Sequence, residues 1–186
     1  AIYTTGGGVW SSTNINATTQ PAGVTWTFAN NGLEETAILD MTASVAGGVL
    51  FSAMGDIAGM RHNDLTVSPA LGMYCLPSMS TTDGIDYAQL NTNYVVREGH
   101  SLRGTAAGGY STDNGQSWVS FGSNPNGTST SSGNGYISVN ANGTVILWSL
   151  PNNTAVYSTN NGTSWTNTSG LPTGAYIASD RVNSTI

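Results

Sequence analysis

One short segment gathers side chains that can do acid–base chemistry or bind a metal ion. Residues 55–65 read GDIAGMRHNDL and hold two aspartates, one arginine and one histidine, in a chain with only ten acidic residues, four arginines and two histidines. Carboxylates and imidazoles are the groups that enzymes most often use to donate or accept a proton. The segment is therefore the candidate functional site, and its candidate residues are Asp56, Met60, Arg61 and His62.

Asp56 is the residue of this segment on which a function would depend most. It follows residues 49–54, an apolar run typical of a buried strand, and glycine precedes it. An aspartate at a strand end either lies among the loops that form a binding site or serves as a cap or turn former. Its position alone leaves both interpretations open.

The spacing disfavours two other chemistries. His62 lies close to Asp64, but the second histidine, His100, is distant in sequence, so we expect no metal site and no cofactor. The sequence contains no Gly-x-Ser-x-Gly segment, so a serine nucleophile is not expected. Glu34 and Glu35 are either a second carboxylate pair or exposed residues beside a sheet edge.

The composition excludes several classes of partner. The 186 residues carry a formal net charge of −6 and include no lysine, so nucleic acid is not an expected partner. No apolar run approaches the roughly 20 residues that span a bilayer, so we expect no membrane partner. No basic region followed by an apolar stretch begins the sequence, so we expect no signal peptide in it. The single Cys75 is expected to be a buried thiol or to have a partner outside the chain.

Glycine, asparagine, serine and threonine dominate the sequence, which favours an all-β fold rich in turns. The same composition favours a secreted, extracellular protein. Asn-x-Ser/Thr sequons support secretion mildly, and several fall in expected turns, where an acceptor would be exposed. The seven candidate glycosylation sites are Asn16, Asn126, Asn142, Asn152, Asn161, Asn167 and Asn183.

An internal repeat is the strongest signal for the fold. Residues 110–118 read YSTDNGQSW, and residues 157–165, 47 positions later, read YSTNNGTSW. A period of roughly 40 to 50 residues is typical of one four-stranded propeller blade. The interval divides into four expected strands with turns between them, at residues 136–139, 144–149, 155–158 and 164–167. We therefore predict β-propeller blades made of four-stranded antiparallel sheets.

The whole chain, residues 1–186, then forms part of one β-propeller domain. Residues 1–31 are material of a preceding blade, and residues 32–91 are a blade with a long active-site loop, because regular periodicity fades between residues 55 and 91. The remaining blades are expected at residues 92–123 and 135–168, with the start of another at residues 174–186. Further strands are expected at residues 36–43, 49–54, 94–97, 108–111, 117–121 and 176–179. At about 45 residues per blade, the chain supplies about four blades, so we expect an incomplete propeller.

Each copy of the repeat matches the Asp-box, a hairpin signature of many propellers. Its expected role is structural: a side-chain oxygen accepts hydrogen bonds from turn amides, a glycine adopts a positive φ, and a tryptophan packs beneath the turn. The second copy keeps an acceptor but loses the charge, which a turn tolerates and a catalytic acid does not. The motif residues are Ser111, Asp113, Gly115 and Trp118, and then Ser158, Asn160, Gly162 and Trp165.

The segment around Asp56 resembles glycoside hydrolase family 74, the xyloglucan-active endoglucanases and oligoxyloglucan hydrolases. The resemblance covers about residues 32–186, and it runs through GLEETA at 32–37, GDIAG at 55–59, HNDLTVSP at 62–69, the first Asp-box and SDRVN at 179–183. It implies two seven-bladed propellers that face each other across a cleft for a branched β-1,4-glucan. The chain would be a segment of the second propeller, with the remainder of the two-propeller enzyme as its partner.

The resemblance also implies inverting hydrolysis of the β-1,4-glucan backbone of xyloglucan, with one aspartate from each propeller. Asp56 matches the general acid, and the general base has no match in this chain, so we expect the chain alone to be inactive. Burial in a cleft would raise the pKa of Asp56, and a contact with Arg61 would lower it. Ala58 and Met60 stand where the resemblance leads us to expect glycine and phenylalanine.

The expected substrate contacts are Met60, which would still cover a sugar ring although it departs from the family pattern, together with Arg61 and His62. Sugar rings are also expected to stack on tryptophan or tyrosine faces, and the candidates for these contacts are Trp10, Trp26, Tyr74 and Tyr87.

Two alternatives remain beside the hydrolase. A non-catalytic propeller that binds glycans or proteins is favoured by the missing general base. A sialidase also contains Asp-boxes, but it grips a carboxylate with three arginines, and the four arginines of this chain lie in unrelated contexts.

Overall fold

A computed structural model of the chain describes residues 1–5, 8–17, 23–31, 36–45, 49–102, 106–125 and 135–185. Two compact units make up the chain, Ala1–Glu35 and Thr36–Ile186. Every regular element within the described ranges is a β-strand, so the expected all-β class is confirmed. None of these segments forms a helix long and apolar enough to cross a membrane. Glu34, Glu35 and Asn126 lie outside the described residues.

The first unit is a three-stranded antiparallel sheet of β1 (Ile2–Thr5), β2 (Gly8–Ser11) and β3 (Thr27–Phe28). Aromatic pairs join its strands. Trp10 packs on Phe28 with ring centroids 5.0 Å apart, and Tyr3 packs on Trp26 at 6.1 Å. Both tryptophans proposed for sugar stacking are thus already paired with a ring inside this unit.

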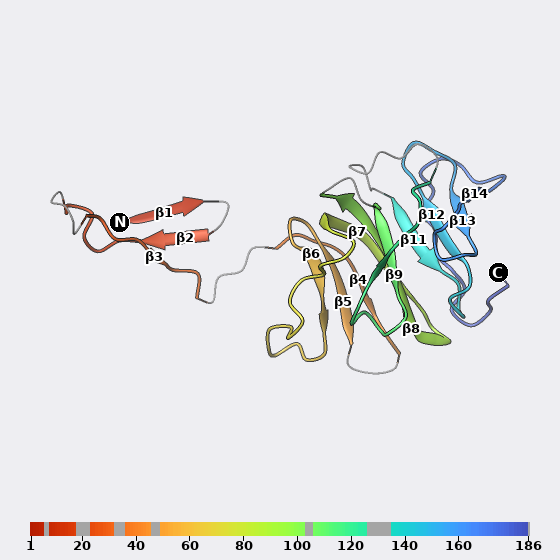
Figure 1. The fold of residues 1–186 in the computed structure, drawn as a ribbon, viewed down its shortest axis with the longest axis horizontal. Coiled ribbons are helices and arrows are strands. Elements are labelled where there is room, and N and C mark those ends of the chain that lie inside the picture. The colour runs from red at the N-terminus through yellow and green to blue at the C-terminus, as the bar shows by residue number, and fades with distance from the viewer. Residues whose placement is uncertain are drawn as a thin grey trace. The chain divides into compact units, whose positions relative to one another are not determined.

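The second unit contains three antiparallel sheets that follow one another along the chain (Figure 1). The first sheet comprises β4 (Ile38–Ala43), β5 (Leu50–Met54) and β6 (Ala58–His62). The second comprises β7 (Met79–Ala88), β8 (Asn91–Ser101), β9 (Gly108–Ser111) and β10 (Val119–Ser120). The third comprises β11 (Tyr136–Val139), β12 (Ile146–Ser149), β13 (Val156–Ser158) and β14 (Thr166–Asn167).

Each sheet of this unit is a meander, in which every strand pairs with the next strand along the chain. Successive sheets meet along their first strands, because β7 lies beside both β4 and β11. Radially repeated meanders of this kind are the blades of a β-propeller. The described sheets do not close into a ring, so the second unit is an incomplete propeller.

The hydrophobic core lies between the sheets. Successive side chains of a strand point to opposite faces, so β8 places Val95 toward the first sheet and Val96 toward the third. Val95 belongs to a buried cluster with Phe51 and Trp118, and Val96 belongs to another with Trp148. Each cluster therefore joins two neighbouring blades, and the central sheet contributes to both.

The structure differs from the long loop expected at residues 55–91. Within this range β6 pairs with β5, and β7 is a ten-residue strand paired with β8. The register of β7 shifts at Met79/Thr81, at Thr82/Gly84 and at Tyr87/Ala88, and such bulges interrupt the alternation of apolar and polar residues. The irregular connection is therefore confined to residues 63–78.

One expected boundary and one expected strand also differ from the structure. The division between residues 91 and 92 falls inside the β7–β8 hairpin, so it separates two strands of a single sheet. No strand is assigned at residues 176–179, because no described segment pairs with them in a ladder. The expected strands at residues 108–111 and 136–139 coincide with β9 and β11.

Candidate active site

Asp56 lies at the tip of the β5–β6 hairpin. The two strands pair until Met54 faces Ala58, and residues 55–57 form the turn between them. The Asp56 backbone has a φ of 65°, in the left-handed region that aspartate adopts more readily than most residues. Its side chain is exposed. The turn thus presents a carboxylate at the end of the sheet.

The residues around the turn fix its shape. Gly59 has a φ of 117°, and a Cβ atom there would lie 2.0 Å from the Ser52 carbonyl oxygen, so only glycine fits. Ala58 is buried and also has a positive φ, 61°, which explains why glycine would suit this position. The Gly55 amide donates to the Ala37 carbonyl at 2.9 Å, which ties the turn to the residue before β4.

Met60 and His62 lie on one face of the hairpin together with Ser52, because Ser52 is opposite Met60 in the strand register. The Ser52 hydroxyl lies 2.9 Å from His62 Nε2 and donates to the Met60 carbonyl at 3.2 Å. Both candidate substrate contacts are half-buried and held in place by one serine. Their role in binding a sugar stays a prediction.

Arg61 lies on the opposite face and reaches the next blade. Its Nε donates to the Asn114 carbonyl at 2.6 Å, and its Nη2 donates to the Asn114 Oδ1 at 3.1 Å. Its Nη1 donates to Asn63 Oδ1. The guanidinium therefore joins the hairpin to the first Asp-box turn, and it is not directed at Asp56. Its role in substrate binding also stays a prediction.

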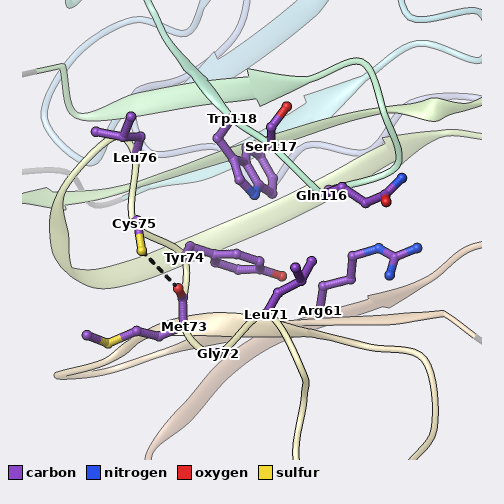
Figure 2. A pocket seen from close by; sticks show the side chains of 11 residues that line it. Arg61, Leu71, Gly72, Met73, Tyr74, Cys75, Leu76, Gln116, Ser117 and Trp118 are labelled. Carbon is purple, nitrogen blue, oxygen red and sulfur yellow. Dashed lines mark hydrogen bonds between the residues drawn. The ribbon is translucent and has the colours of Figure 1, made fainter.

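A hollow of about 260 Å³ lies on this side of the hairpin, between residues 71–76 and residues 115–118, with Arg61 at its margin (Figure 2). Its floor is made by Tyr74 and Trp118, which meet edge to face at 5.1 Å. The guanidinium of the fully buried Arg97 lies 4.9 Å from the Tyr74 ring centroid and 4.8 Å from that of Trp118. Both rings are thus packed in the core and offer no open face for a sugar ring.

The two Asp-box turns have closely similar hydrogen bonds. In the first, Asp113 accepts from the Ser117 amide at 2.8 Å and from its hydroxyl at 2.6 Å, and Ser111 Oγ accepts from the Gly115 amide at 2.8 Å. The hydrogen bonds from Ser117 and Ser111 lower the pKa of Asp113 against the opposing effect of burial.

In the second turn Asn160 replaces the aspartate. Its Oδ1 accepts from the Ser164 amide at 3.0 Å, and Ser158 Oγ accepts from the Gly162 amide at 2.9 Å. The tryptophans are placed differently in detail, since Trp118 is buried and Trp165 is half-buried against Phe121. The turns are thus built from local hydrogen bonds, and the charge is not required for them.

Each Asp-box turn also packs onto the preceding sheet. A Cβ atom at Gly115 would lie 2.5 Å from the Phe51 ring, and one at Gly162 would lie 2.3 Å from the Phe121 ring. The asparagine before each glycine also accepts a hydrogen bond from the preceding sheet. Asn114 Oδ1 accepts from Arg61 on the first sheet, and Asn161 Oδ1 accepts from the Tyr94 hydroxyl on the second sheet at 2.8 Å. The sequence predicts the turn itself but not this contact between blades.

Other candidate residues are placed apart from Asp56. The Asp64 carboxylate accepts from the hydroxyl and the amide of Thr66, which lower its pKa, and the group is fully exposed. Cys75 is exposed, so the buried-thiol alternative is wrong. Tyr74 and Tyr87 are buried. The exposed sequon asparagines are Asn16, Asn142, Asn152, Asn161 and Asn167, whereas Asn183 is half-buried.

The sequence reasoning missed three carboxyl groups on β4, β7 and β8, one of them fully buried and two half-buried. Asp40 on β4 accepts from the Ile85 amide at 3.0 Å, and Asp83 on β7 lies 3.1 Å from His100. Glu98 on β8 is fully buried. Burial raises the pKa of all three. The signal in the sequence was a charged residue at positions that read as strand, in a chain with few charges.

No group of three or more histidine, cysteine, aspartate or glutamate side chains is arranged to hold a metal ion among the described residues. The chemistry that this site offers is that of an exposed carboxylate at a hairpin tip, with an apolar methionine and a serine-bound imidazole further along β6.

Comparison with known proteins places this geometry in a family. No protein-family model matches the chain. A xyloglucanase of Paenibacillus sp is 32% identical in an alignment of 186 positions that covers 98% of this chain and 18% of that protein. An oligoxyloglucan-reducing end-specific xyloglucanase of Emericella nidulans is 32% identical in an alignment of 154 positions that covers 80% of this chain and 19% of that protein. The chain thus spans about a fifth of the length of these curated relatives.

A solved structure shows the same likeness. The GH74 xyloglucanase of Xanthomonas campestris superimposes with a TM-score of 0.80 at 32% identity, over 97% of this chain and 26% of that chain. The meander sheets and this superposition define the chain as part of a β-propeller. The matching sequences and structure are xyloglucanases, and the chain is homologous to a segment of glycoside hydrolase family 74.

Proposed function

We propose that the chain is part of a secreted glycoside hydrolase that cleaves the β-1,4-glucan backbone of xyloglucan with inversion, and that Asp56 is its general acid. The observation that carries the proposal is the exposed Asp56 carboxylate at the tip of the β5–β6 hairpin, in a chain whose matches over nearly its whole length are xyloglucanases. The wider enzyme supplies the general base.

The geometry of the hairpin suits this role. An inverting hydrolase needs two carboxyl groups about 6.5 to 9.5 Å apart, with the acid on the leaving group and the base on a water molecule. Asp56 is exposed, so a second body of the enzyme and a bound glucan can cover it. Such cover raises the pKa of a carboxyl group by desolvation, which keeps the acid protonated for transfer to the departing oxygen.

The test is the Asp56→Asn variant of the full-length enzyme. We expect kcat for xyloglucan to fall at least about 100-fold, because a general acid contributes about 10² to 10⁴ in rate. An aryl glycoside with an acidic leaving group needs less protonation and is expected to lose less. Near-normal hydrolysis of xyloglucan by this variant would exclude the assignment.

The matched control is Asp64→Asn, because Asp64 is another exposed aspartate near the same hairpin whose carboxylate is engaged by Thr66. This variant is expected to keep its activity. Inversion is tested separately, by NMR detection of the α-anomer as the first product. The 186-residue chain alone is expected to release no reducing ends from xyloglucan.

Met60 and His62 are proposed substrate contacts on the same hairpin as Asp56, because both lie on one face of β6 with Ser52. Secretion is proposed from the composition, and the five exposed sequon asparagines support glycosylation. A shift of intact mass on treatment with an endoglycosidase tests this part of the proposal.

The second candidate is a non-catalytic propeller that binds glycans. One specific observation favours it: the chain contains no second segment that resembles the one around Asp56 and that would supply a base. Binding of xyloglucan by the full-length protein without release of reducing ends would support this candidate over the hydrolase.

A further inference from the structure

The hairpin turn that carries Asp56 has a strained backbone. Asp56 and Ala58 have positive φ values of 65° and 61°, and Gly59 follows with a φ of 117°. Residues other than glycine incur a steric cost in this left-handed region, so they stay in it only where neighbouring contacts hold the backbone. The Ile57 amide donates to the Gly55 carbonyl, and the Gly59 amide donates to the Ile57 carbonyl. These bonds lie within the hairpin, so the contacts that fix it to the protein must come from elsewhere.

Two neighbouring segments hold the turn, one on each side. On the β4 side, the Gly55 amide donates to the Ala37 carbonyl at 2.9 Å. On the β6 side, the Tyr74 amide donates to the Gly59 carbonyl at 3.0 Å, and the Tyr74 hydroxyl donates to the Met60 carbonyl at 2.7 Å. Tyr74 therefore binds two successive carbonyls of the strand that leaves the turn.

Tyr74 is itself held firmly. Its buried ring meets Trp118 edge to face (Figure 2), and the Arg97 guanidinium lies 4.9 Å from the ring centroid. Arg97 also donates to the carbonyls of Leu76 and Pro77 at 2.7 and 3.0 Å, which fixes the loop just after Tyr74. Burial raises the pKa of the Tyr74 phenol, so the hydroxyl keeps its proton and remains a donor. The tyrosine is thus a rigid support for β6.

We propose that Tyr74 is a positioning residue for Asp56, because its two hydrogen bonds to β6 hold the turn in the conformation from which the carboxyl group reaches the departing glycosidic oxygen. This inference rests on the proposed function. Ala58, two residues after Asp56, lies in the same buried cluster as Tyr74, so side-chain packing supports the same turn. A general acid must lie within hydrogen-bond reach of the oxygen that it protonates. A small displacement of the turn therefore slows proton transfer while the glucan still binds.

The test is Tyr74→Phe in the full-length enzyme, which removes the hydrogen bond to Met60 and keeps the ring in the core. We expect kcat for xyloglucan to fall about 10-fold and KM to change less than about twofold. Tyr94→Phe is the matched control, because Tyr94 is also buried and its hydroxyl donates to Asn161 Oδ1 at 2.8 Å, but it belongs to the other buried cluster. It is expected to leave kcat unchanged. Thermal unfolding compares the stability lost by the two variants.

Two readouts separate positioning of the acid from a general structural role. An aryl glycoside with an acidic leaving group needs little protonation, so Tyr74→Phe is expected to hydrolyse it within about twofold of the parent. In the Asp56→Asn enzyme, Tyr74→Phe is expected to cause no further loss of kcat for xyloglucan, because the group that it positions is already gone.

The positioning role would be overturned by a normal kcat in Tyr74→Phe, by an equal loss in Tyr94→Phe, by equal losses on the two substrates, or by additive losses in the double variant. A failure of the proposed function shows itself differently, as near-normal hydrolysis of xyloglucan by the Asp56→Asn enzyme.

Discussion

At the scale of single residues, the fully buried Glu98 and the half-buried Asp40 and Asp83 are expected to make the stability of the second unit depend on pH. Burial raises the pKa of Glu98 well above its ordinary value of 4.5, and the nearby charges of Asp83 and Asp40 raise it further. Burial likewise raises the pKa of Asp40, against hydrogen bonds from Ile85 and Met41, and that of Asp83, against the charge of His100.

The sign of the effect follows from proton binding. A raised pKa means that the folded protein keeps a proton at a pH where the unfolded chain has lost it. The stability from such a group is fully present below the ordinary carboxyl pKa and is lost as the pH rises through the raised value. The free energy of unfolding is therefore expected to fall from about pH 4.5 toward neutral pH, by up to about 1.4 kcal/mol per pH unit for the fully buried Glu98 and by less for the half-buried Asp40 and Asp83.

Glu98→Gln tests this dependence, because glutamine cannot ionise. The variant is expected to be more stable than the parent at pH 7, and the difference is expected to shrink as the pH falls to 5. Urea unfolding at pH 5, 6 and 7 measures both. Asp64→Asn is the control, because hydrogen bonds lower the pKa of Asp64 below its ordinary value of 3.8, so its stability relative to the parent is expected to stay constant between pH 5 and pH 7. A Glu98→Gln difference that is independent of pH would contradict the interpretation.

At the scale of elements, the glycines of the two Asp-box turns serve the packing of blades as well as the turn. Gly115 and Gly162 have φ values of 75° and 71°, and each touches an aromatic ring of the preceding sheet. A side chain at either position is strained by the backbone and also pushes two sheets apart.

Gly115→Ala and Gly162→Ala are each expected to lower the free energy of unfolding by about 2 to 4 kcal/mol. Gly170→Ala is the matched control, because Gly170 has a φ of 82° and a Cβ atom there would meet no other group within 4 Å, so only the backbone strain of about 1 kcal/mol applies. Thermal unfolding of the three variants measures the difference. Equal losses in all three would show that the contact with the preceding sheet contributes nothing.

The elements also show what a sequence reveals of such a fold. Strands β9 and β11 could be predicted because alternation and flanking turns are local signals. Strand β7 could not be predicted, because its three register shifts break the alternation of apolar and polar residues. Strand β6 could not be predicted either, because its sequence, AGMRH, does not alternate. The turn at Asp56 was predictable from an apolar strand followed by glycine. The bond from Arg61 to Asn114 joins residues 53 positions apart, and no local pattern encodes it.

At the scale of the whole second unit, the segment after β14 holds the blades together without forming a strand. Arg181 Nη1 donates at 2.7 Å to Asp86 Oδ1 and at 2.7 Å to the Tyr87 carbonyl on β7. Asp86 Oδ2 accepts from the Ser138 hydroxyl and from the Val139 amide on β11. One carboxylate thus links the second blade, the third blade and the C-terminal segment.

Arg181→Ala is expected to lower the free energy of unfolding by about 2 kcal/mol, because it leaves the buried Asp86 without its cation. Arg181→Lys keeps the charge but not the planar fork, so about half of the loss is expected. Urea unfolding of both variants checks the order. An Arg181→Ala variant as stable as the parent would show that the segment does not secure the blades.

The outer edge strand of the first sheet, β6, is covered by the loop that follows it. Strand β6 would expose unpaired backbone there, but Met73 bridges to Met60, the Tyr74 amide donates to the Gly59 carbonyl at 3.0 Å, and the Tyr74 hydroxyl donates to the Met60 carbonyl at 2.7 Å. Free strand borders recruit strands from other molecules and so seed fibres. We therefore expect the loop that carries Tyr74 to disfavour edge-to-edge self-association in crowded solution.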